Sequence, residues 1–323
     1  MANKQKGFAL IGILAIAIVL AAVAGVGYYV WYKHHKPLKP YSPVVSSSTV
    51  STTTSTSGKV TEDLTKLPLG DGNVTTTTPQ ANYVYSCTNN FKGGGAEHAG
   101  SWISGNTWNA KTKPTVDGSV SWPSAKVDIS IQGASRIISG NGLPVGTPTG
   151  IFPIQKGTTA YQYDTNPNSI KSYNVYVSLP DNPTVASAPG CLPLGPIGYM
   201  TNGVALFDAL DDAGRDAAAH EIQDKCDGHP QKEGIYHYHS LSSCIDATAG
   251  NNQLLGYALD GFGIYSDKDA SGNVITNGQL DICHGLTSEI TWDGKQVNMY
   301  HYVLNNEYPY SLGCFRGVPV QTH

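Results

Sequence analysis

Residues 236–239 carry the clearest capacity for chemistry in this chain, because two tyrosines and two histidines alternate there as Tyr-His-Tyr-His. In an extended strand, alternate side chains point to opposite faces, so His237 and His239 share one face and Tyr236 and Tyr238 the other. Residues two apart on one strand face lie about 7 Å apart, a spacing at which two imidazoles can close on one metal ion. We therefore predict half of a metal site here, with the tyrosine face packed in a core.

Further histidines gather in the second half of the chain, at His220, His229, His284 and His301. His301 stands in a weaker echo of the first run, Met-Tyr-His-Tyr at residues 299–302. We predict that His301 and His229 complete the site begun by His237 and His239. Copper or zinc is the expected ion, because neutral imidazole ligands suit both metals.

Polar side chains near these motifs are expected to hold the imidazoles in one tautomer by hydrogen bonding. The set expected around the ligands is Asp260, the best candidate, with Asp227, Tyr236 and Tyr238. Two other interpretations stay open. The tyrosines and histidines could form a buried hydrogen-bonded lattice without a metal, or neutral histidines could run acid–base chemistry alone.

Several familiar catalytic motifs are missing from the sequence. His220-Glu221 begins like the zinc-protease motif His-Glu-x-x-His, but Asp224 stands where the second histidine must fall. The chain has no glycine-rich phosphate loop, nucleotide fingerprint or Gly-x-Ser-x-Gly elbow. These absences leave the histidine cluster as the main candidate.

The ordered motifs resemble those of the YHYH-domain family, which is carried mainly by exported microbial proteins. The resemblance runs from about residue 151 to residue 317. Its matching segments are residues 203–207, 226–229, 236–239, 254–262, 280–285 and 307–317. It implies a family of folds rather than a defined activity.

The N-terminus predicts a membrane anchor over residues 1–36. Residues 8–30 contain no charged side chain, and this stretch is long enough to form a membrane-spanning helix. Tyr28, Tyr29 and Trp31 form an aromatic collar at its C-terminal end. A cleaved signal peptide is an alternative. So is a type IV pilin leader, which residues 6–11 weakly resemble. Each interpretation places the rest of the chain outside the cytoplasm, at the cell surface or in a periplasm.

A polar linker and an exported domain follow the anchor. Residues 37–81 are rich in Ser, Thr and Pro and predict a disordered stalk. From residue 82 to residue 323, short β-like runs alternate with turn signals. The net charge of −4 shows no basic excess, so a nucleic-acid partner has no electrostatic support.

The six cysteines form no Cys-x-x-Cys pair, so disulfides are favoured over a zinc–thiolate site. Sequence alone leaves the pairing open; we expect Cys226 with Cys244, Cys283 with Cys314, and Cys87 with Cys191. The predicted fold class is mostly β, a disulfide-braced, β-sandwich-like domain with short helices, behind one transmembrane helix and the stalk.

The functional expectation is a membrane-anchored, extracytoplasmic module that binds copper or zinc. The membrane and other envelope or surface components are its expected partners. Two alternatives belong to other classes: a structural or adhesion domain, pilin-like, whose histidines are scaffold, and a metal-dependent hydrolase or oxidoreductase. The sequence does not decide whether the chain is an enzyme.

Overall fold

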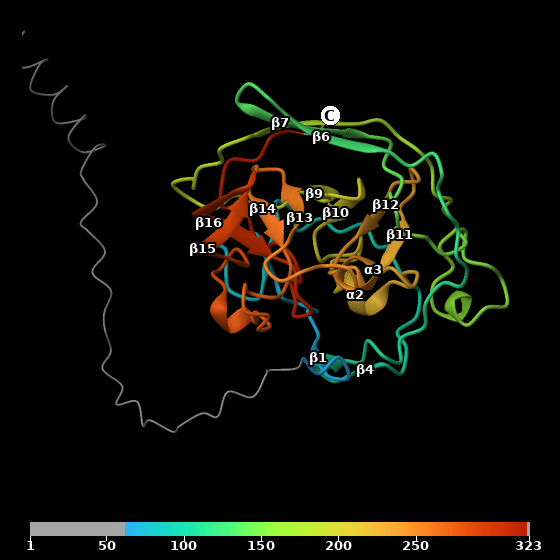
Figure 1. The fold of residues 1–323 in the computed structure, drawn as a ribbon. Helices are drawn as coiled ribbons and strands as arrows, with labels where there is room; N and C mark the ends of the chain where they lie inside the picture. Colours follow the sequence, from blue (N-terminus) through green and yellow to red (C-terminus); the bar gives the residue numbers. More distant parts are fainter. Residues whose placement is uncertain (1–61, 322–323) are drawn as a thin grey trace, which may run out of the picture. The chain divides into compact units, whose positions relative to one another are not determined.

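The computed structural model of the chain describes residues 62–321. The anchor, the pilin-like leader and most of the stalk predicted above lie outside these residues. Within residues 62–321 no helix is long and apolar enough to cross a membrane. This part of the chain is mostly β, with a few short helices and three disulfides (Figure 1).

Most of the strands and helices are short, and loops of varying length separate them. In chain order they are β1 (Leu67–Pro68), β2 (Val74–Thr75), β3 (Val84–Tyr85), β4 (Ile103–Ser104), β5 (Thr107–Trp108), β6 (Val127–Gln132), β7 (Ser135–Gly140), η1 (Ala160–Gln162), β8 (Val175–Pro180), β9 (Pro196–Met200), β10 (Ala205–Phe207), α2 (Ala217–His220), β11 (Gly228–Pro230), β12 (Tyr236–Tyr238), α3 (Ser243–Asp246), β13 (Leu254–Ala258), β14 (Gly263–Tyr265), η2 (Asn277–Gln279), β15 (Gly285–Trp292) and β16 (Lys295–Val303).

An eight-stranded mixed sheet forms the centre of the structure, in the order β11-β12-β10-β9-β13-β14-β16-β15. The order reads the same from both ends once β9 is matched with β13, β10 with β14, β11 with β15 and β12 with β16. Figure 1 shows the two sets on either side of the sheet's middle. Each set has the same pairing directions: its third and fourth strands are antiparallel, and its second and fourth are parallel.

The two halves meet symmetrically at the middle of the sheet. Tyr199 of β9 pairs with Tyr257 of β13, and these two tyrosines occupy the same place in their strands. On either side, Gly198 pairs with Ala258 and Met200 with Gly256. Gly198 and Gly256 are equivalent positions, as are Met200 and Ala258, so the two pairs are the same contact seen from either half. Such a reciprocal contact is the signature of two-fold symmetry.

A turn before the third strand repeats in detail. Asp224 accepts hydrogen bonds from the backbone amides of Cys226 and Gly228, and its own amide bonds back to the Gly228 carbonyl. In the other half Asp281 makes the same three contacts with Cys283 and Gly285. Residues 196–244 and 254–314 are therefore two internal repeats of one motif, each with a disulfide from this turn to a cysteine beyond its fourth strand.

Smaller sheets surround the central one. β6, β7 and β8 form an antiparallel sheet, β1, β5 and β4 another, and β2 pairs with β3. The first strands fall within residues 62–81, which the sequence assigned to the stalk. Leu67 of β1 belongs to the core, so the ordered chain begins before residue 82. The sandwich-like packing stays a prediction.

Aromatic side chains and disulfides hold the repeats together. Tyr236, Tyr238, Tyr302 and Phe262 are fully buried, which gives each half a large apolar area removed from water. The three disulfides join Cys87 to Cys191, Cys226 to Cys244 and Cys283 to Cys314, the pairs expected from the sequence.

Candidate metal centre

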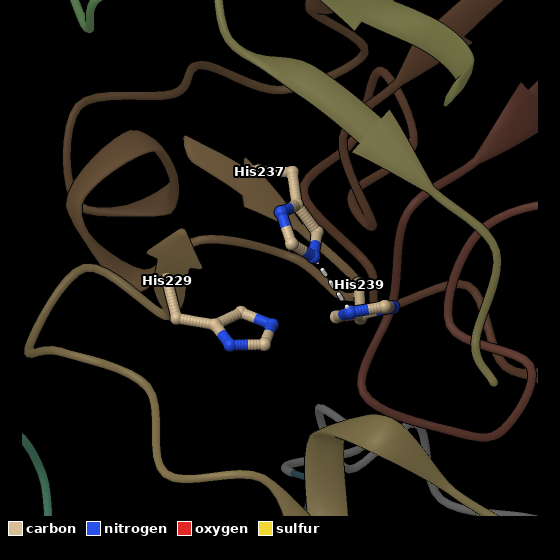
Figure 2. Close-up of side chains that lie close together, drawn as sticks. All are labelled: His229, His237 and His239. Carbon is tan, nitrogen blue, oxygen red and sulfur yellow. Dashed lines mark hydrogen bonds between the residues drawn. The ribbon is translucent and has the colours of Figure 1, made fainter. Parts of the chain in front are cut away.

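The hairpin of β11 and β12 places two of the histidines. His229 lies directly opposite His237 in the antiparallel register, so both side chains leave the same face of the sheet. His239 follows β12 and lies on this face too, because it is two residues beyond His237. Figure 2 shows the three rings turned toward one another. All three side chains are almost completely buried.

The ligand atoms of the three histidines converge. One ring nitrogen from each of His229, His237 and His239 can be chosen so that all lie within 4.8 Å of one another. The Nε2 atoms of His237 and His239 are 3.0 Å apart. Among the described residues this is the one group of three or more potential ligands placed this closely.

Glu221 adds a carboxylate to the same point. Its Oε2 atom lies 3.2 Å from Nε2 of His229 and 3.3 Å from Nε2 of His239. The residue follows α2, whose first turn is capped by the Asp216 carboxylate. Gly95, at φ +74°, lies against the other side of the carboxylate, where an added Cβ would come 3.1 Å from Oε1. Three imidazoles and one carboxylate thus face a common centre.

Backbone carbonyls set the tautomers of two histidines. Nδ1 of His237 lies 3.0 Å from the carbonyl of Ile235, and Nδ1 of His239 contacts the carbonyl of Asp208. A carbonyl can only accept, so both Nδ1 atoms carry hydrogen and the neutral rings present bare Nε2 lone pairs. Two lone pairs 3.0 Å apart repel unless a cation lies between them, either a proton or a metal ion.

A negative charge on Glu221 dominates the electrostatics of the site. Burial acts to raise the pKa of Glu221, but ion pairing and hydrogen bonding with His229 and His239 outweigh burial and hold the pKa well below its ordinary value. Burial likewise acts to lower the pKa of His239, and Glu221 outweighs it and raises that pKa. Burial and the neighbouring histidines hold the pKa of His237 well below its usual range. These shifts favour His239 over His237 as the ring that carries an extra proton.

The histidines open into a cavity of about 210 Å³. Phe207 of β10 forms part of its wall and stacks on His237, with ring centroids 3.9 Å apart. Asp208 is buried there, its Oδ2 atom has no hydrogen-bond partner, and burial raises its pKa to about 7. Carboxylates outnumber the one lysine of the lining, Lys232; besides Glu221 and Asp208 they are Glu97, Asp164, Asp211 and Asp212. The cavity is an acidic one.

His301 does not reach this centre, so the prediction that it completes the ligand set is wrong. It lies on β16, and four strands of the sheet separate β16 from β12. Its Nδ1 atom is 3.1 Å from the carbonyl of Met299, and its ring packs edge-on against Tyr265. The two Tyr-His-Tyr runs lie on different halves of the sheet, which linear spacing could not show.

The polar residues expected around the ligands also lie elsewhere. Asp260 accepts hydrogen bonds from the Tyr302 hydroxyl and the amides of Arg316 and Gly317. Asp227 accepts one from the amide of Ser243. Those interactions brace loops of the scaffold rather than the histidines.

The two tyrosines of the run have the core position expected of them, and no direct contact with a ligand nitrogen. The Tyr236 hydroxyl donates to the Asp224 carboxylate, and the Tyr238 hydroxyl accepts from the amide of Asn202. Carbonyls of Ile235 and Asp208 fix the imidazoles instead. The sequence carries no signal for a backbone carbonyl in this role.

Glu221 is a functional residue that the sequence does not mark as a ligand. It lies among the acids near the histidine motifs, and with His220 it forms only the beginning of a zinc-protease motif. The carboxylate reaches the histidines from a different segment, through the turn that leads from α2 toward β11. Its position depends on tertiary packing.

The comparison with known families agrees with these landmarks. A family model described as YHYH protein matches residues 176–276. This match supports the YHYH family for the chain. It covers Glu221 and the three converging histidines and ends before His301. No curated protein and no solved structure matches.

Proposed function

We infer that the YHYH region binds one transition-metal ion through His229, His237 and His239, with Glu221 as the fourth donor. The observation that carries this proposal is the convergence of three imidazole nitrogens and one carboxylate oxygen, from different elements, in one buried place. A hydrogen-bonded lattice needs donors matched with acceptors. Here the Nε2 atoms of two neutral rings face each other without a hydrogen, and only an added proton or a metal ion joins them.

The donor set favours zinc or copper. Imidazole nitrogens suit zinc, copper, iron and nickel, whereas calcium and magnesium prefer oxygen ligands. The carbonyls behind His237 and His239 hold the rings in the tautomer that metal binding requires. The ion's positive charge would also balance Glu221, which is buried and, within residues 62–321, forms ion pairs only with His229 and His239.

An extracytoplasmic location is part of the proposal. All six cysteines are joined in three disulfides, which persist in oxidising compartments and are rare in reducing ones. The apolar N-terminal segment would attach this module to a membrane. Other envelope or surface components remain candidate partners.

A second candidate function, a metal-dependent hydrolase or oxidoreductase, is favoured by the cavity beside the ligands. A catalytic metal site keeps one coordination position open, and the space of about 210 Å³ beside the histidines would let a bound molecule reach the ion in place of Glu221. Asp208 lies in that wall with a free carboxylate oxygen, suited to accept a proton from a bound molecule. The adjacent acids favour a neutral or cationic ligand over an anionic one.

Metal analysis of the full chain tests the proposal. The protein, purified with its disulfides intact, is stripped with a chelator and titrated with Zn²⁺ and Cu²⁺ alone, with bound metal read by mass spectrometry. We expect one ion per chain, lost in His237→Gln/His239→Gln and retained in the matched variant His301→Gln. A folded wild type that takes up neither ion, or a loss caused equally by His301→Gln, contradicts the proposal.

A further inference from the structure

We propose that the second repeat contains a silent counterpart of the metal site, centred on His301 and lacking only its other ligands. The proposal rests on the function inferred above, because it takes the first repeat as the metal-binding form of the motif. It assigns to residues 285–303 a latent capacity for a transition-metal ion. The two-fold symmetry of the central sheet supports this assignment.

The matched strands place each ligand's counterpart without ambiguity. His229 pairs with His237 in the first repeat, and Leu286 pairs with His301 in the second. Leu206 pairs with Tyr238 in parallel, as Ile264 pairs with Tyr302. It follows that Val303 is the counterpart of His239. Glu221 precedes Asp224 by the same number of residues as Gly278 precedes Asp281, so glycine replaces the carboxylate.

The surroundings of His301 resemble those of His237, although the other ligand positions near His301 carry no donor atom. His301 directs Nδ1 to the carbonyl two residues before it, as His237 does. Tyr265 packs on His301 from the strand position that Phe207 occupies beside His237. Burial lowers the pKa of His301, so the ring is neutral near pH 7 and its Nε2 is available to a metal.

The tyrosines on the opposite face repeat as well. Tyr300 donates to Asp281 as Tyr236 donates to Asp224, and each pair of tyrosines packs edge-to-face, with centroids 5.4 Å apart in the second repeat and 5.6 Å in the first. The strand that carries His301 is thus held in the same orientation. At the four ligand positions the second repeat keeps one histidine and carries three substitutions, each of which removes a donor atom.

Restoring ligands in the second repeat tests this assignment. The main variant is Leu286→His/Val303→His, and Leu286→Asn/Val303→Asn is its control, which adds polar side chains without imidazoles. Val303 is fully buried, whereas Leu286 is only partly buried. Leu286→His alone is therefore a second variant, because the partly exposed position has more room for an imidazole. Each change is made in wild type and in His237→Gln/His239→Gln, and folding is checked by circular dichroism.

The expected stoichiometry with Cu²⁺ or Zn²⁺ alone is one ion in wild type and two in the histidine variant. In the background without the first site, the histidine variant should hold one ion and the asparagine control none. Leu286→His alone should gain a weaker second site that His301→Gln abolishes. If the folded histidine variants gain no ion in either background, the silent-site proposal is wrong. If the histidine variants bind one ion through the second repeat but wild type binds none, the silent-site proposal stands and the proposed metal binding by the first repeat is wrong.

Discussion

His237 and His239 hold their Nε2 atoms 3.0 Å apart, and each directs Nδ1 to a backbone carbonyl. The arrangement forces a cation between the two rings. A proton can take this place when no metal ion does, and Glu221 favours it by raising the pKa of His239. A metal ion must displace this proton, so metal binding and protonation compete for one position.

Metal affinity should therefore fall as the pH falls. Glu221 raises the pKa of His239 above its ordinary value of 6.5, so this ring keeps its proton to a higher pH than a free imidazole does. Above the raised pKa the affinity should be independent of pH; below it, the affinity should drop about tenfold per pH unit, as one proton is displaced. Calorimetric titration in buffers of different ionisation enthalpy measures the released proton. A constant affinity from pH 5 to 8, a range of about 3 units around the imidazole value, would contradict this linkage.

Replacing Glu221 with glutamine should weaken metal binding by about 10- to 100-fold at a pH above the His239 transition. The change keeps the side-chain shape and removes the charge that faces His229 and His239. It should also lower the pKa of His239, so that proton competition begins at a lower pH. NMR titration of the histidine resonances follows this shift.

Glu97→Gln is the matched control for that substitution. Glu97 lines the same cavity but bonds Thr165 rather than a histidine. Its loss removes one charge from the wall and should change metal affinity by less than about threefold, the size of a weak electrostatic effect. Equal losses in both variants would show that Glu221 acts only through the general field of the cavity.

The sequence was sufficient for the strand and its pair of histidines, and insufficient for the complete site. Alternation in Tyr-His-Tyr-His places His237 and His239 on one face of any extended strand. His229 lies close to this run in sequence, and His301 lies in a similar run, so both are reasonable third ligands from the sequence. Only the order of the strands in the sheet decides between them. Glu221 depends on how α2 packs, and its sequence neighbours give no sign of that. The palindromic sheet order likewise emerges only from long-range pairing.

The disulfide between Cys226 and Cys244 closes a segment that contains all three histidine ligands. Cys226→Ala/Cys244→Ala should lower the unfolding free energy by about 3 kcal/mol and also weaken metal binding, because the freed segment must be ordered when the ion binds. Urea unfolding and metal titration measure the two effects. Cys87→Ala/Cys191→Ala should destabilise the fold by a similar or larger amount, because the disulfide that it removes closes a longer loop. It should leave the metal affinity of the folded protein unchanged. A parallel loss of affinity in both variants would mean that general instability is the cause.

His284 should make the fold sensitive to acid, independently of the metal centre. It is buried in the Asp281 turn at φ +68°, and neither ring nitrogen has a hydrogen-bond partner within residues 62–321. Burial lowers its pKa from 6.5 to about 3. The unfolded chain therefore takes up a proton near pH 6.5 that the folded chain refuses until about pH 3, so stability is full above 6.5 and is lost as the pH falls between these values, by at most about 1.4 kcal/mol per pH unit.

Substituting His284 with asparagine tests that slope, because asparagine tolerates the left-handed backbone conformation and does not titrate. The unfolding free energy, measured by urea denaturation at a series of pH values, should fall less steeply below pH 6.5 in His284→Asn than in wild type. The comparison uses slopes rather than absolute values, since a buried amide carries its own constant cost. Identical slopes in the two proteins would show that the buried carboxylates, and not His284, govern the acid response.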